Sequence, residues 1–228
     1  TICLGVGTYN LGEAPLPINI SGARSLTLRG QGMQTRLVYA GHGAALAVDS
    51  SVEVTVEKLM LVTSASTGDV QPAIRFSNST NITLQRCAAL RLAAANTDSA
   101  VVGLGGILIG TIIRQNEFLA PVGIGNIPGA QPGGAVFAAQ AQPLLTLSLF
   151  VEENMLLCSS RGISLIGVSL HVLETRIAGN FLNDCAQGGI VALGFVPAGS
   201  NMNVQCNEIR ASGTGIIIGT SGASITGN

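Results

Sequence analysis

A six-residue pattern of apolar and polar positions recurs along the chain. It consists of an aliphatic residue, two variable residues, an asparagine, one variable residue and a second apolar residue. The copies are Ile113–Phe118, Val151–Leu156, Ile177–Leu182, Val204–Ile209 and, cut short, Ile225–Asn228. Their asparagines, separated by 38, 26, 27 and 21 positions, are Asn116, Asn154, Asn180, Asn207 and Asn228. Going backwards, Cys87, Leu59 and Gln31 fill the same slot at steps of 29, 28 and 28. Such a period indicates structural units stacked on one another.

Short runs of β-branched and aliphatic residues recur in phase with this pattern, and glycines flank many of them. These runs are Leu46–Val48, Ile74–Phe76, Ile107–Ile109, Val136–Ala138, Ile163–Leu165, Ile190–Ala192 and Ile216–Ile218. Short β-branched runs bounded by glycine are typical of strands, and no amphipathic helical period stands out. Two or three short strands per repeat predict an all-β fold, a right-handed parallel β-helix of about seven to eight coils.

The recurring asparagines have a structural explanation in such a fold. They fall between strands, where the chain must bend, and asparagine tolerates the left-handed backbone conformation that a bend requires. Stacked amide side chains can also donate and accept hydrogen bonds along the axis of the helix. We therefore predict a buried asparagine ladder with a structural role.

Composition narrows the possible classes of protein. The 228 residues suit one domain spanning 1–228 and are 47% hydrophobic but only 10% charged, against a usual charged fraction of about 25%. The uncharged stretch 118–151 contains four prolines and offers no membrane span. A net charge of −1 gives no electrostatic footprint for nucleic acid. The chain starts at Thr1 and shows no polar C-terminal cap, so we expect it to be a piece of a longer protein.

The five cysteines show no metal-ligand spacing. Cys158 and Cys185 lie 27 positions apart at equivalent places in neighbouring repeats. Small buried apolar residues are the simplest interpretation, and a disulfide between these two stays open. We predict no cofactor, and calcium remains an open alternative.

The opening of the chain resembles a known family. Ile2–Tyr9 reads Ile-x-Leu-x-x-Gly-x-Tyr, and Leu26–Gly32 reads Leu-x-Leu-x-Gly-x-Gly. These segments and the coils after them resemble the pectin-lyase-like right-handed parallel β-helix superfamily. The resemblance implies the fold and an extracellular or cell-surface location. It does not choose among activities, because the superfamily includes lyases, hydrolases, tailspikes and non-catalytic modules.

The polygalacturonase pattern of that superfamily is incomplete here. Asn96–Asp98 and Gly41–Gly43 match two of its tripeptides in reversed order, without the Asp-Asp pair or Arg-Ile-Lys. An inverting hydrolase needs two carboxylates. We interpret both matches as coincidences and expect Glu152 to form a surface ion pair with Arg114. The residues that would serve an enzyme are His42, Asp98, Arg75 and Glu153.

Strand alternation predicts an outward column that is mostly apolar, comprising Ala47, Arg75, Leu108, Phe137, Ser164, Val191 and Ile217. Leu108, Phe137, Val191 and Ile217 would then form an interface with a second copy or a neighbouring domain. The Gly- and Pro-rich stretch Leu119–Gly134 is expected to be a loop, either a binding loop or a tolerated insertion. The favoured function is a scaffold or binding module for protein association or polysaccharide contact. The alternative is a polysaccharide lyase or hydrolase, including one with a site between subunits.

Overall fold

Successive coils of the chain pair in parallel, each strand with its equivalent one coil away. The computed structural model describes residues 1–65, 71–93, 100–126, 144–167, 170–194, 201–210, 213–219 and 222–228. Within these ranges the only helical element is a single 3-10 turn, η1 (Gly32–Gln34). The strands form three faces, which we call sheets A, B and C, and the predicted parallel β-helix is confirmed.

Sheet A contains the strands that precede the ladder asparagines. In order of pairing these are β1 (Ile2–Cys3), β4 (Arg24–Arg29), β7 (Val52–Glu57), the second half of β9 (Ile74–Gln85), β12 (Thr111–Arg114), β15 (Leu149–Glu152), β18 (Glu174–Ala178), β21 (Asn201–Gln205) and β24 (Ala223–Thr226).

Sheet B contains the strands that follow the ladder position. They are β2 (Gly7–Asn10), β5 (Thr35–Tyr39), β8 (Met60–Ala65), β10 (Ala88–Ala93), the first parts of β13 (Glu117–Asn126) and β16 (Met155–Gly167), β19 (Phe181–Asn183) and β22 (Glu208–Arg210).

Sheet C closes each coil. It is made of β3 (Ile18–Ser21), β6 (Leu46–Asp49), the first half of β9, the first part of β11 (Ala100–Ile109), the ends of β13 and β16, β20 (Gly188–Gly194) and β23 (Ile216–Gly219). Two short strands, β14 (Leu144–Thr146) and β17 (Leu170–Val172), extend from the end of β11.

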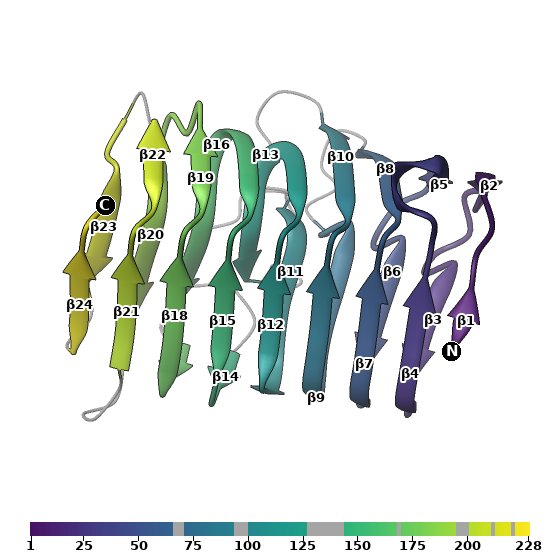
Figure 1. Cartoon of the computed structure of the whole chain (residues 1–228), viewed down its shortest axis with the longest axis horizontal. Helices are drawn as coiled ribbons and strands as arrows, with labels where there is room; N and C mark the ends of the chain where they lie inside the picture. Colours follow the sequence, from purple (N-terminus) through teal and green to yellow (C-terminus); the bar gives the residue numbers. More distant parts are fainter. Residues whose placement is uncertain are drawn as a thin grey trace.

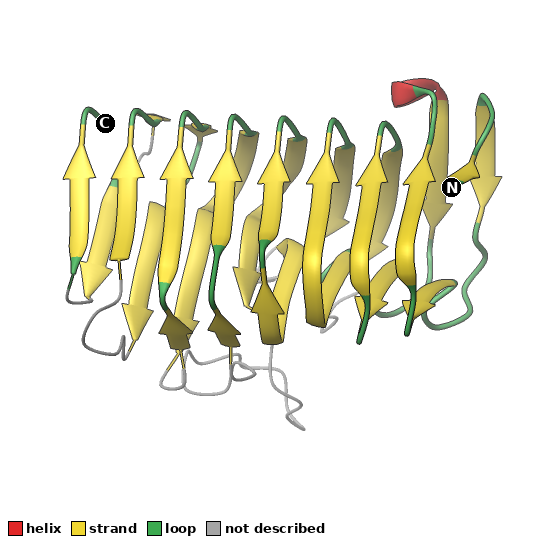
Figure 2. Cartoon of the chain, turned by 60° about the horizontal axis from the view of Figure 1, so that its bottom comes forward, coloured by secondary structure: helices red, strands yellow, loops and turns green. Residues whose placement is uncertain are grey.

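The coils wind in a right-handed sense. In Figure 1 the strands of sheet A point upward in front, the chain returns behind through sheet C, and the coils advance from the N-terminus at the right to the C-terminus at the left. Figure 2 shows the same stack after rotation, with the parallel strands of each face side by side. This is the hand that parallel strands joined by crossovers nearly always adopt.

The first aliphatic residue of each repeat builds the core. Val56, Leu84, Ile113, Val151, Ile177 and Val204 stack directly on one another in sheet A and are fully buried. An apolar column through the length of the helix accounts for the high hydrophobic fraction, because every coil contributes to one dry interior.

The asparagine ladder is confirmed. The side-chain amide nitrogens of Asn116, Asn154 and Asn180 each donate to the side-chain oxygen of the next asparagine at 2.9 Å, and Asn207 donates to Asn228 at 2.7 Å. Each side-chain oxygen also accepts the backbone N–H of the preceding ladder residue. Every amide thus joins two coils, as buried polar groups require.

The bend beside the ladder differs from the expectation in one respect. The residue in the left-handed conformation is the one before the ladder position, with φ of 54° at Arg86, 56° at Gln115, 55° at Glu153, 63° at Gly179 and 52° at Cys206. The asparagines are therefore selected for their amides, and the preceding residue makes the turn.

One of the in-phase runs was assigned to the wrong place. Val102–Leu104 of β11, rather than Ile107–Ile109, pairs with Ile74–Phe76. The next coil uses the end of β13, where Ile124 pairs with Val102 and with Ile163. Val136–Ala138 lies outside the described residues. The predicted loop Leu119–Gly134 is also wrong in its first half, because β13 continues to Asn126.

The cysteine thiols are free. Cys87, Cys158 and Cys185 belong to the core cluster, as expected for small apolar residues. Burial raises the pKa of Cys87 to about 12 and that of Cys185 to about 11, because a buried thiolate loses its hydration.

Candidate functional site

The residues proposed for an enzyme are dispersed in the described parts of the chain. His42 is exposed in the turn between β5 and β6, where its backbone carbonyl accepts the Tyr39 hydroxyl at 2.7 Å. Arg75 lies on the outward side of sheet C. Glu153 forms the turn between sheets A and B in a later coil and accepts a hydrogen bond from Gln115 at 2.9 Å. Asp98 lies outside the described residues.

Asp49 is a carboxylate whose charge interacts with that of Arg75. Burial alone would raise its pKa, but hydrogen bonds from Ser77, Ser50 and Asn78 and the positive charge of Arg75 hold the pKa of Asp49 below its usual value. The Ser77 hydroxyl donates to Asp49 at 2.6 Å, and the Ser50 hydroxyl donates at 2.8 Å. The lowered pKa keeps this carboxylate charged, and its hydrogen bond with Ser77 links two neighbouring coils.

No three His, Cys, Asp or Glu side chains in the described ranges gather in a way that could hold a metal ion. The described part of the chain also has no helix with the length and apolarity to cross a membrane.

The side chains that point outward from sheet C differ from the column that the sequence predicted. The register places Gly103 and Gly125 between Arg75 and Ser164. Leu108 is 0% exposed and belongs to the core instead, and Phe137 lies outside the described residues. Val191 does point outward, yet it is only 3% exposed, and Ile217 is partly buried.

The expected ion pair between Arg114 and Glu152 is replaced by two other contacts. The two residues do pair in register, but Arg114 donates to the Gln85 side-chain oxygen at 2.8 Å. Glu152 instead lies 3.3 Å from Arg176 in the following coil. Both are partly exposed, so each contact adds little stability.

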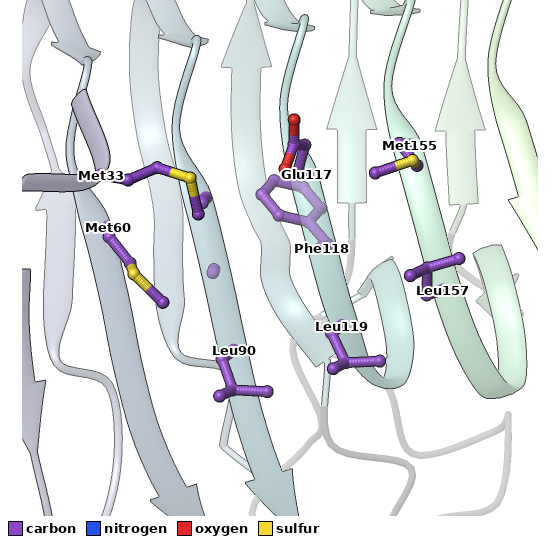
Figure 3. A pocket seen from close by; sticks show the side chains of 10 residues that line it. Met33, Met60, Leu90, Glu117, Phe118, Leu119, Met155 and Leu157 are labelled. Atoms are coloured by element: carbon purple, nitrogen blue, oxygen red, sulfur yellow. The ribbon is translucent and has the colours of Figure 1, made fainter.

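The most distinctive surface is an apolar groove on sheet B. Its outer wall is formed by Met33 of η1 and by side chains that point outward from β8, β10, β13 and β16 (Figure 3). Met33 is 54% exposed, Leu119 50% and Met155 37%. The groove, about 180 Å³ in volume, is defined by Met33, Met60, Leu90, Leu119, Met155 and Leu157, and Glu117 is the one charged residue in the part of its lining that the structure describes.

Strand alternation explains how the groove is positioned. Leu61, Ala89, Phe118 and Leu156 stack inward in register and are buried. The residues on either side of each therefore point outward, and in the central coils these are also apolar except for Glu117. Such strands are apolar on both faces, the pattern that parallel strands show when both faces are covered.

The sequence contains a signal for this groove. The segments that follow the ladder slot, Met60–Val62, Ala88–Leu90 and Met155–Leu157, are continuously apolar rather than alternating. A strand with one solvated face is expected to alternate, so these segments mark sheet B as the face with unusual surface chemistry.

Comparison with known proteins yields only distant structural similarities. No protein-family model and no curated protein matches the chain. Among solved structures it is similar to the A-module of mannuronan C-5 epimerase AlgE4 from Azotobacter vinelandii, with 11% identity over 99% of this chain and 90% of the other and a TM-score of 0.30. It is also similar to the catalytic domain of GH87 α-1,3-glucanase in complex with nigerose, with 11% identity over 99% and 63% of the two chains and a TM-score of 0.21. At these values the similarity carries no argument about activity, and the fold assignment rests on the strand pairing itself.

Proposed function

We propose that this β-helix is a scaffold that binds another protein through the apolar groove on sheet B. The observation that carries this proposal is the exposure of Met33, Leu119 and Met155 in one contiguous strip. Exposed apolar residues gathered in one place mark interaction sites, whereas scattered ones need no explanation. Methionine also suits such a surface, because its flexible side chain adapts to the shape of a partner.

The chemistry of the lining favours a protein over a polysaccharide. A sugar needs polar groups for its hydroxyls and often an aromatic ring for its apolar face. Among the described residues, Glu117 is the one charged side chain that lines the groove. The ring of Phe118 is 1% exposed and therefore faces the core. Burying apolar side chains of another protein in the groove would stabilise the complex by about 25 cal/mol per Å² of apolar surface removed from water.

Site-specific cross-linking tests the proposal. A photoreactive benzoylphenylalanine in place of Leu119, in the full protein in the cells that produce it, should yield a covalent adduct with protein after irradiation. The matched control is the same residue in place of Thr55, which points outward from sheet A. Adducts at position 119 and not at 55 support the proposal. Equal labelling at both positions, or an adduct with polysaccharide, would overturn it.

A further inference from the structure

Sheet B carries opposite charges three coils to either side of Glu117 in an outward column, with mainly apolar side chains between them, and Thr8 continues the column beyond Arg36. The column, followed through the strand register, reads Arg36, Met60, Ala88, Glu117, Met155, Phe181 and Glu208. Arg36 and Glu208 are both exposed. Coils repeat at about 4.8 Å, so these two residues are about 29 Å apart.

The charges on two copies of sheet B are complementary in one relative orientation of the copies. If a second copy packed on sheet B with its coils in the same order, Arg36 would lie opposite Arg36 and Glu208 opposite Glu208. If the coils ran in the opposite order, each Arg36 would lie opposite Glu208 of the other copy. Like charges opposed at an interface are costly and opposite charges fix its register, so the second orientation is favoured.

We propose that the groove is occupied by a second copy of this chain, packed face to face about a two-fold axis that passes through Glu117 parallel to the strands. The inference rests on the proposed function, since it names the protein that the groove binds. A two-fold interface uses the same patch on both copies. The strip provides that patch, with Met60 and Met155 around the axis and charges at the rim.

Arg36 and Glu208, the charged residues at the rim of the proposed interface, each make a contact within one copy. The Arg36 guanidinium donates to the Met33 carbonyl at 3.4 Å, which holds its side chain beside the groove. Glu208 accepts from Arg210 at 2.6 Å, and Arg210 lies 5.2 Å over the ring of Phe181. The Arg210–Glu208 pair is exposed on both sides and therefore contributes little. The carboxylate can engage a second guanidinium, since it has two oxygens.

Glu117 provides an independent check on the position of the axis. In this arrangement each Glu117 meets the same residue of the other copy, and the two carboxylates repel. Glu117→Gln should therefore tighten the dimer. An arrangement that leaves Glu117 in contact with water gives no reason for tightening.

Sedimentation velocity over a concentration series of the purified chain tests the dimer. We expect the wild type to dimerise, R36E and E208R each to weaken dimerisation about tenfold or more, and the double variant R36E/E208R to recover it. R24E makes the same charge change at an exposed residue of sheet A and should leave the dimer unchanged. Thermal midpoints close to that of the wild type would establish that the variants fold.

Three results would overturn the dimer. They are a monomer at every concentration, a double variant no tighter than either single variant, and a dimer that Glu117→Gln weakens. A monomer whose position 119 still cross-links to a different protein in cells overturns only the second copy as occupant. A monomer without such cross-links overturns the proposed function as well.

Discussion

Each ladder asparagine satisfies backbone groups that a bend would otherwise leave unpaired. The Asn180 side chain accepts both the backbone N–H and the amide of Asn154, and it donates to the carbonyls of Val151 and Ala178. Since the residue is 1% exposed, water cannot replace these partners. The asparagine therefore stabilises three segments of chain with one side chain.

Replacing Asn180 with Leu should lower the free energy of unfolding by about 3 kcal/mol, because each buried polar group left without a partner costs about 1–3 kcal/mol. The measurement is urea denaturation of the two proteins. Asn19→Leu, at an exposed strand position, is the matched control and should change stability by less than about 0.5 kcal/mol. An unchanged midpoint for Asn180→Leu would show that the ladder is not buried.

Cys87 shows how far the repeat could be interpreted from sequence. Its backbone N–H donates to the Asn116 side chain at 2.9 Å, as the ladder asparagines do. Its thiol is 3.7 Å from the Val56 carbonyl, the position that the amide takes in later coils. The spacing placed Cys87 in the slot correctly. The left-handed residue was assigned one position too late, because asparagine itself favours that conformation and the sequence alone offered no reason to prefer its neighbour.

The turn between sheets A and B is the element that sets the direction of the chain after every coil. It uses a left-handed residue in each repeat from Lys58 onward, and only some repeats use glycine there, as at Gly179. A Cβ at Gly179 would lie 3.7 Å from Glu153 Cγ, an ordinary contact. Any cost of substitution there comes from the backbone conformation rather than from a clash.

Gly179→Val should therefore destabilise the protein by about 2 kcal/mol, since a β-branched residue strongly disfavours positive φ. Gly179→Asn keeps a residue that tolerates this conformation and should cost less than about 1 kcal/mol. Thermal or urea unfolding of both variants measures the difference. Equal losses for the two variants would contradict a backbone origin and indicate a steric one.

Strand β13 is a part of the fold that the sequence did not predict. Its Pro121 and its glycines are typical of a loop. In the structure Pro121 sits at a register irregularity between Ala120 and Val122, one of the few places where a strand tolerates proline. A Cβ at Gly123 would lie 2.6 Å from the carbonyl of Gly162 in the next coil, so glycine permits close approach there. Pairing with neighbouring coils overrides local preference, and the sequence alone does not contain that pairing.

The molecule as a whole combines a predictable interior with a surface that was harder to infer. The repeat predicted the core column and the ladder, because both depend on residues spaced by one coil. The apolar surface was also expected, but on sheet C, since the strand register there was shifted by the misassigned run at Ile107–Ile109. Sheet B carries that surface instead, through Met33, Leu119 and Met155.

Methionine oxidation measures directly whether this groove is covered in the assembled protein. Met33 and Met155 are exposed in the isolated chain, while Met202 is 2% exposed in the core and serves as an internal control. Hydrogen peroxide converts accessible methionine to the sulfoxide, and mass spectrometry of peptides gives the rate at each residue. If a partner covers the groove, Met33 and Met155 should oxidise several-fold more slowly in the native assembly than in the dilute purified chain, with Met202 slow in both. Equal rates at Met33 and Met155 in the two samples would contradict it.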